Sequence, residues 1–139
     1  MLIYDDIFHW DGWGGKLKLA SGRCRLRIYD ESLEKSGSSI LLRPIVVISK
    51  DIGRESMSIR SCSGNIATLV TKQFGIDPRR MLWVEYYAAS EYGVGKVHKI
   101  PERFDIVEFN WHEGKAIEPR WRPLGPLMLG TIKKMVDGW

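Results

Sequence analysis

Residues 58–87 read SIRSCSGNIATLVTKQFGIDPRRMLWVEYY, and this stretch decides the fold. Its first part predicts a helix, because apolar residues recur at the spacing of one helical face: Ile66, Leu69, Val70 and Phe74. Ser61 or Ser63 can cap the first turn of this helix. Gly75 predicts a left-handed end, and Pro78 prevents the helix from resuming.

Strands are predicted on both sides of this helix. Residues 82–87 are β-branched and aromatic, and residues 44–49 form a short apolar run typical of a strand covered on both faces. Residues 23–29 alternate between an apolar face and an arginine face. Weaker patterns predict further strands at 2–10, 16–20, 104–111 and 116–122. Pro119 and Pro123 indicate that the last of these lies at a sheet edge.

The order of these elements predicts a single α+β domain over residues 1–139. We expect a mainly antiparallel sheet of about five or six strands, packed by the central helix. A short amphipathic helix is expected at 127–136. Residues 31–40 and 88–101 lack periodicity and are predicted to be loops.

The composition, with 44% hydrophobic and 27% charged residues, is typical of a globular protein. The net charge of +4 mildly favours an anionic partner, although 17 acids are spread among 21 bases. The two cysteines, Cys24 and Cys62, form neither a disulfide framework nor a metal-ligand pair. Without a basic leader or an apolar run of membrane length, we expect a cytoplasmic protein with no membrane association, metal or cofactor.

Several short motifs lie in the second half of the chain: Ser58-Ile59, Asn65-Ile-Ala-Thr, Phe74-Gly-Ile-Asp-Pro-Arg-Arg-Met-Leu-Trp-Val-Glu-Tyr-Tyr and Trp121-Arg-Pro-Leu. In this combination the chain resembles a family of small uncharacterised bacterial proteins. The resemblance covers roughly the second half of the chain and implies a single-domain bacterial protein. It implies no activity and transfers no catalytic residue.

The start of the central helix is the first candidate site. Free N–H groups and the helix dipole attract anions, and an arginine, two hydroxyls and a small residue lie there: Arg60, Ser61, Ser63 and Gly64. These residues could bind a phosphate or a carboxylate. The alternative is simple helix capping, because the full phosphate-loop pattern is absent.

Cys62 is the second candidate, as a nucleophile whose thiolate would be favoured at a helix start beside Arg60. Catalysis would also need a base and an orienting acid. The candidate bases are His9, His98 and His112, and the candidate acids are Glu85 and Glu108. The alternative is an inert packed cysteine.

The third candidate is the arginine strand, which comprises Arg23, Arg25 and Arg27 on one face of residues 23–29. Guanidinium groups about 7 Å apart match a phosphate backbone or an acidic protein surface. Trp10 and Trp13, beside a glycine-rich loop, could add a stacking platform or fold back over the core. The alternative for the arginines is a cross-strand ladder, in which Glu85 and Glu108 neutralise them.

Our leading hypothesis is a small bacterial binding or adaptor protein that recognises an anionic partner, either nucleic acid or an acidic protein surface. The arginine strand and the tryptophan loop would form the contact, and binding is favoured over catalysis. One alternative is a small enzyme that uses Cys62 or the helix start. Another is a subunit of a larger assembly, or a homo-oligomer, with tryptophans as interface anchors.

Overall fold

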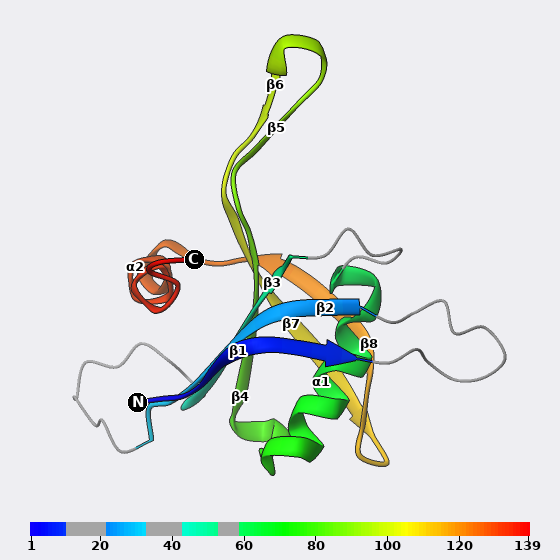
Figure 1. The fold of residues 1–139 in the computed structure, drawn as a ribbon. Coiled ribbons are helices and arrows are strands. Elements are labelled where there is room, and N and C mark those ends of the chain that lie inside the picture. Colours follow the sequence, from blue (N-terminus) through cyan, green and yellow to red (C-terminus); the bar gives the residue numbers. More distant parts are fainter. Residues whose placement is uncertain (11–21, 33–42, 53–58) are drawn as a thin grey trace, which may run out of the picture.

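The computed structural model describes residues 1–10, 22–32, 43–52 and 59–139 (Figure 1). The helices are α1 (Ile59–Phe74) and α2 (Pro126–Met135). The strands are β1 (Leu2–Trp10), β2 (Gly22–Asp30), β3 (Ile45–Asp51), β4 (Met81–Tyr87), β5 (Ser90–Tyr92), β6 (His98–Ile100), β7 (Arg103–His112) and β8 (Lys115–Pro123). Short 3-10 turns at Pro78–Arg80 and Val94–Lys96 precede β4 and link β5 to β6.

Six strands form one sheet, in the order β1-β2-β3-β4-β7-β8. All neighbours are antiparallel except β3 and β4, which are parallel and are connected through α1. A parallel pair requires a crossover of this kind, because both strands must start at the same end of the sheet. The predicted α+β class, with a mainly antiparallel sheet, a central helix and a short C-terminal helix, is confirmed.

α1 covers one face of the sheet. Its buried residues form one helical stripe: Ile59, Cys62, Ser63, Ile66, Ala67 and Val70. Leu26, Val47 and Trp83 of the sheet belong to the same core. The prediction that Leu69 belongs to this stripe is wrong, because its side chain is exposed. Gly75 has a φ of +64°, which confirms the predicted left-handed end of the helix.

α2 covers the opposite face of the sheet (Figure 1). There Ile132 and Met135 of α2 pack in a second core, whose sheet residues include Val46, Ile48, Val84 and Ile106. β3 therefore contributes side chains to both cores, and residues 45–49 are all buried. This confirms the prediction of a strand covered on both faces.

β5 and β6 form a separate two-stranded ribbon that projects from the sheet (Figure 1). We call residues 90–100 the arm. The arm is the far end of a long hairpin whose near end is the antiparallel pair of β4 and β7. The prediction of a loop at 88–101 is therefore wrong. Each arm strand has only three residues, which is too short for alternation to reveal it.

Some predictions fall outside the described residues, namely the strand at 16–20 and most of the loop at 31–40. Among the helices in the described ranges, none has both the length and the apolar character needed to cross a membrane.

Gly22 lies opposite Trp10 where β1 and β2 pair, and a Cβ atom at Gly22 would lie 2.4 Å from Cζ2 of the indole. Because Trp10 is buried, we expect Gly22→Ala to lower the free energy of unfolding by about 1–3 kcal/mol, as overpacking does. Urea denaturation measures this change. The control is Gly130→Ala in α2, where a Cβ atom meets nothing within 4 Å. This variant should be stabilised by about 0.5–1 kcal/mol, and equal effects at both positions would contradict the packing argument.

Candidate functional site

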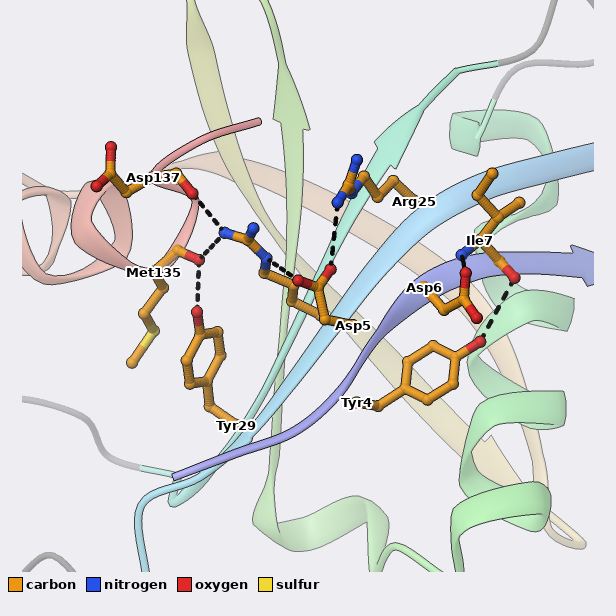
Figure 2. A network of polar contacts seen from close by, with 9 residues as sticks. Tyr4, Asp5, Asp6, Ile7, Arg25, Tyr29, Met135 and Asp137 are labelled. Atoms are coloured by element: carbon orange, nitrogen blue, oxygen red, sulfur yellow. Dashed lines mark hydrogen bonds and ion pairs between the residues drawn. The ribbon is translucent and has the colours of Figure 1, made fainter.

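The three residues of the arginine strand belong to β2, and their side chains lie on the sheet face that α2 covers. Arg25 Nη2 is 3.7 Å from Asp5 Oδ1, and Arg27 Nε is 3.2 Å from Asp5 Oδ2 (Figure 2). Two of the three arginines therefore share one carboxylate of the neighbouring strand β1. Arg23, at the other end of the row, is exposed.

Arg27 and Tyr29 also hydrogen-bond to the C-terminal end of α2. Figure 2 labels Tyr29 and the acceptor residues Met135 and Asp137. Arg27 Nη1 donates hydrogen bonds of 2.9 Å to the carbonyl oxygens of Met135 and Asp137. The Tyr29 hydroxyl donates to the carbonyl oxygen of Met135 at 2.7 Å. The Arg27 guanidinium lies 4.8 Å from the centre of the Trp139 ring. A cation is favourable at this end of a helix, so Arg27 acts here as a dock for the chain's own C-terminal segment.

Glu85 and Glu108 do not neutralise the arginines, and this predicted pairing is wrong. Glu85 lies on the opposite face, beneath α1, where its carboxylate contacts Tyr87 and Trp121. Glu108 Oε1 pairs with Arg122 Nε of β8 at 3.1 Å. The reason is strand order, because β2 has β1 and β3 as neighbours and neither β4 nor β7 lies beside it.

The predicted tryptophan platform is not formed by Trp10. Its side chain is buried in the core beneath α1, so its ring faces are not available for stacking by a partner. Trp13 lies outside the described residues.

The start of α1, the predicted anion site, is partly packed. Ser63 is buried and its hydroxyl donates to the carbonyl oxygen of Arg60 at 3.2 Å. A Cβ atom on Gly64 would lie 3.2 Å from the carbonyl oxygen of Ala116 in β8. Arg60 and Ser61 are exposed, and the Arg60 guanidinium lies 4.5 Å from the centre of the Trp121 ring. Anion binding by these four residues stays a prediction, with Arg60 and Ser61 as its surface members.

The environment of Cys62 contradicts the predicted activated thiolate. Its side chain is 1% exposed, and burial raises its pKa. Burial also raises the pKa of Cys24 to about 12. The histidines proposed as its base lie on other elements, with His98 in β6 and His112 at the end of β7. The buried site disfavours the thiolate that a nucleophile requires.

We therefore expect both thiols of the folded protein to react with a disulfide reagent at neutral pH at least about tenfold more slowly than free cysteine. Both should react at the free rate once the chain is unfolded in denaturant. Spectrophotometric thiol titration measures both rates. Fast reaction of one thiol in the folded protein, mapped to Cys62 by mass spectrometry, would revive the nucleophile hypothesis.

A buried polar cluster around Glu85 lies on the α1 face, towards the carboxyl ends of β3 and β4. The sequence predicted Glu85 as an orienting acid or as a partner of the arginines, and did not predict this cluster. Glu85 is fully buried, and its Oε2 accepts hydrogen bonds from the Tyr87 hydroxyl at 2.5 Å and from Trp121 Nε1 at 2.9 Å. Burial raises the pKa of Glu85, while Tyr87, Trp121 and the Arg60 charge oppose this effect. In the sequence, the signal for a buried carboxyl was the single acid, Glu85, inside the otherwise apolar and aromatic strand at 82–87.

Two buried oxygens in this group have no hydrogen-bond partner among the described residues, namely Glu85 Oε1 and the hydroxyl of Ser49. Ser49 is the register partner of Glu85, so both side chains point to the same face. Asp105, the partner of Glu85 on the other side, pairs with Arg103 at 3.0 Å. The hydrogen bond from Trp121 to Glu85 connects β8 to β4. Because Glu85 and Ser49 are fully buried, these side chains are hardly accessible to a ligand.

The arm presents the opposite situation, with large apolar side chains on the surface. Val94 is 95% exposed and Val97 is 73% exposed, both at the turn between the two strands. Tyr92 and Ile100 on the strands are also exposed. None of these four residues belongs to either core. Val94 between two glycines, with Val97 close behind it, was a signal in the sequence that helical or strand periodicity does not detect.

The arm also carries positive charge. Lys96 and Lys99 lie in the arm, whose single acid is Glu91 on β5. The rings of Tyr92 and His98 stack at 4.9 Å across the ribbon. An open hollow of about 690 Å³ beside the arm is lined in part by Lys96, Lys99 and Ile100. The arm therefore combines exposed apolar groups with cations, which is the composition of a binding surface.

Comparison of the chain with family models, with curated proteins and with solved structures finds no match. The resemblance of the second half of the chain to a bacterial family therefore stays a prediction. Within residues 1–10, 22–32, 43–52 and 59–139, no group of His, Cys, Asp and Glu side chains could hold a metal ion.

Proposed function

We propose that this protein is a binding or adaptor protein that holds an acidic protein surface through the arm. The observation that carries this proposal is the exposure of Val94 and Val97 at the tip of a projecting ribbon. Burying one such side chain contributes about 1.5–3 kcal/mol, and in this structure the two valines remain exposed to solvent.

The charge of the arm supports an acidic partner. Lys96 lies between the two valines of the tip and Lys99 lies two residues after Val97, and protein interfaces commonly surround an apolar centre with polar and charged residues. A nucleic acid is a weaker candidate, since its recognition relies on a strongly basic surface and offers few apolar groups. In addition, Arg25 and Arg27 of the predicted arginine strand already have partners within the chain.

The test compares partner capture by the wild type and by a protein without the arm. Replacing residues 89–101 by Asn-Gly, a sequence that favours a tight hairpin turn, joins β4 directly to β7. Because the arm contributes to neither core, the free energy of unfolding should change by less than about 1 kcal/mol. Partners cross-linked to the wild type in cells should no longer be captured.

Point variants separate the two contributions. Val94→Ser with Val97→Ser removes the apolar tip, and Lys96→Glu with Lys99→Glu reverses its charge. The matched control, Lys72→Glu with Lys134→Glu, makes the same charge change on exposed positions of α1 and α2. Loss of capture in both arm variants and retention in the control is expected. Equal capture by all proteins, including the one without the arm, would refute the proposed function.

A further inference from the structure

The outer edge of β1 is blocked at Ile7, near the middle of the strand. The N–H group of Ile7 donates to Asp6 Oδ1 at 2.7 Å, and the Tyr4 hydroxyl donates to the carbonyl oxygen of Ile7 at 3.4 Å (Figure 2). Side chains of β1 itself thus occupy both backbone groups of Ile7, which an added strand would otherwise pair with. Occupying an edge in this way protects a sheet from unwanted pairing.

The outer edge of β8 is closed as well. The N–H group of Ala116 donates to Thr68 Oγ1 of α1 at 2.9 Å, so the helix covers the start of this strand. Pro119 and Pro123 have no N–H group to offer further along it. Both edges of the six-stranded sheet therefore resist the addition of a strand.

The edges of the arm are different, because among the described strands β5 and β6 pair with no strand other than each other. β3 ends at Asp51 and β8 at Pro123, so neither strand extends beside the arm. In the described part of the chain, no side chain hydrogen-bonds to the backbone of β5 or β6. An isolated two-stranded ribbon is only marginally stable in water, and a third strand stabilises it.

We infer that β6 accepts an extended segment of the partner protein as a third strand, and that this segment alternates apolar and acidic residues. The inference rests on the proposed function and specifies its mode of recognition. Main-chain hydrogen bonds would supply affinity, and alternate side chains would supply specificity.

The two faces of the arm determine this alternation. Register partners share a face, so Tyr92 and His98 lie on the same side as Ser90 and Ile100. Lys99 lies on the other side, opposite Glu91. Apolar residues of the added strand would pack beside Ile100 and the stacked rings, and its acidic residues would lie beside Lys99. On the β5 edge the same acidic residues would lie beside Glu91 and be repelled. We therefore expect the segment to pair with β6 rather than with β5.

The probe is a fluorescein-labelled peptide of about nine residues, a typical strand length, that alternates valine and glutamate. Two control peptides have valine and glutamate in two separate blocks, or alternate valine and lysine. Fluorescence anisotropy with the wild type should show the block peptide binding at least about tenfold more weakly, and the lysine peptide not binding. Lys99→Glu should reverse the preference towards the lysine peptide, and Lys134→Glu should leave it unchanged.

Backbone pairing is tested by N-methylation of alternate amides of the peptide, because only every second N–H group of a strand faces its neighbour. Methylation of one set should abolish binding, and methylation of the other set should not. Equal binding of the alternating and block peptides, or insensitivity to both N-methylation sets, would overturn the inference. Sedimentation of the protein as a dimer that is lost without the arm would also overturn it, since a second copy would then occupy the edge.

The two proposals can fail separately. If removal of the arm abolishes cellular capture while no alternating peptide binds, the proposed function stands and strand addition is wrong. If capture also survives removal of the arm, both are wrong.

Discussion

Glu85→Gln should raise the free energy of unfolding by about 1–2 kcal/mol above the folded-state pKa of Glu85, where the carboxylate is charged, because a neutral amide avoids the cost of a buried charge with one unpaired oxygen. The amide oxygen can still accept from Tyr87 and Trp121. The amide nitrogen of the new glutamine is a hydrogen-bond donor beside Ser49, the register partner of position 85. The Ser49 hydroxyl has no hydrogen-bond partner among the described residues.

The sign of the pH dependence follows from the raised pKa of Glu85 in the folded protein. A carboxyl whose pKa is raised by folding stabilises the protein fully below its unfolded pKa, and this contribution is lost as pH rises through the folded pKa. The wild type should therefore lose stability relative to Glu85→Gln as pH rises. Urea denaturation of both proteins at a series of pH values isolates this difference, since all other groups are common to them.

Glu85→Ala provides the contrasting variant. It leaves the Tyr87 hydroxyl and the Trp121 indole without their acceptor and opens a cavity, so we expect a loss of about 2–4 kcal/mol. A constant difference between wild type and Glu85→Gln across the pH range would show that Glu85 titrates normally, contrary to the burial argument.

Arg27→Ala should lower the free energy of unfolding by about 2–4 kcal/mol, because hydrogen bonds from a charged group contribute about 1.5–3 kcal/mol each. Two such bonds, to the carbonyl oxygens of Met135 and Asp137, are lost together with the ion pair to Asp5. The side chain is only 12% exposed, so water replaces these contacts poorly. Hydrogen exchange in α2 should become faster than in α1.

Three further variants test this assignment. Tyr29→Phe removes one hydrogen bond to Met135 and should cost about 1 kcal/mol. Arg27→Lys keeps the charge but loses the planar guanidinium group, so its free energy of unfolding should lie between those of the wild type and Arg27→Ala. Arg120→Ala, at an exposed position of β8, should change stability by less than about 0.5 kcal/mol. If Arg27→Ala were equally mild, the arginine would be a surface group rather than the dock for α2.

The arginine strand illustrates what periodicity can and cannot establish. Alternation placed Arg25 and Arg27 on one face of a strand, and the structure confirms this. Alternation along one strand does not reveal which strands lie beside it. The acid that pairs with Arg25 and Arg27, Asp5, could therefore not be distinguished from Glu85 or Glu108. The docking of α2 on the same face involves residues more than a hundred positions away in the chain, beyond any local pattern.

The candidate sites show the same limit. The prediction that Ser61 or Ser63 caps the helix is wrong, because α1 already begins at Ile59 and both serines lie inside its first turns. Cys62 faces the core because of its place on the helical stripe. The arm was not predicted, because its strands are short and are recognised only by their pairing with each other. Its exposure depends on where β3 and β8 end, which is a property of the assembled sheet.

The sequence by itself determined the local elements of this protein: the helix with its glycine end, the strands flanking it, and the α+β class. These follow from side-chain periodicity and from the backbone preferences of glycine and proline, which act over a few residues. Only the tertiary structure decided the parallel pairing of β3 with β4, the burial of Glu85, the docking of the C-terminal helix on Arg27, and the projection of the arm. These depend on which segments meet in space, and such contacts are selected by packing of the whole chain rather than by any one stretch.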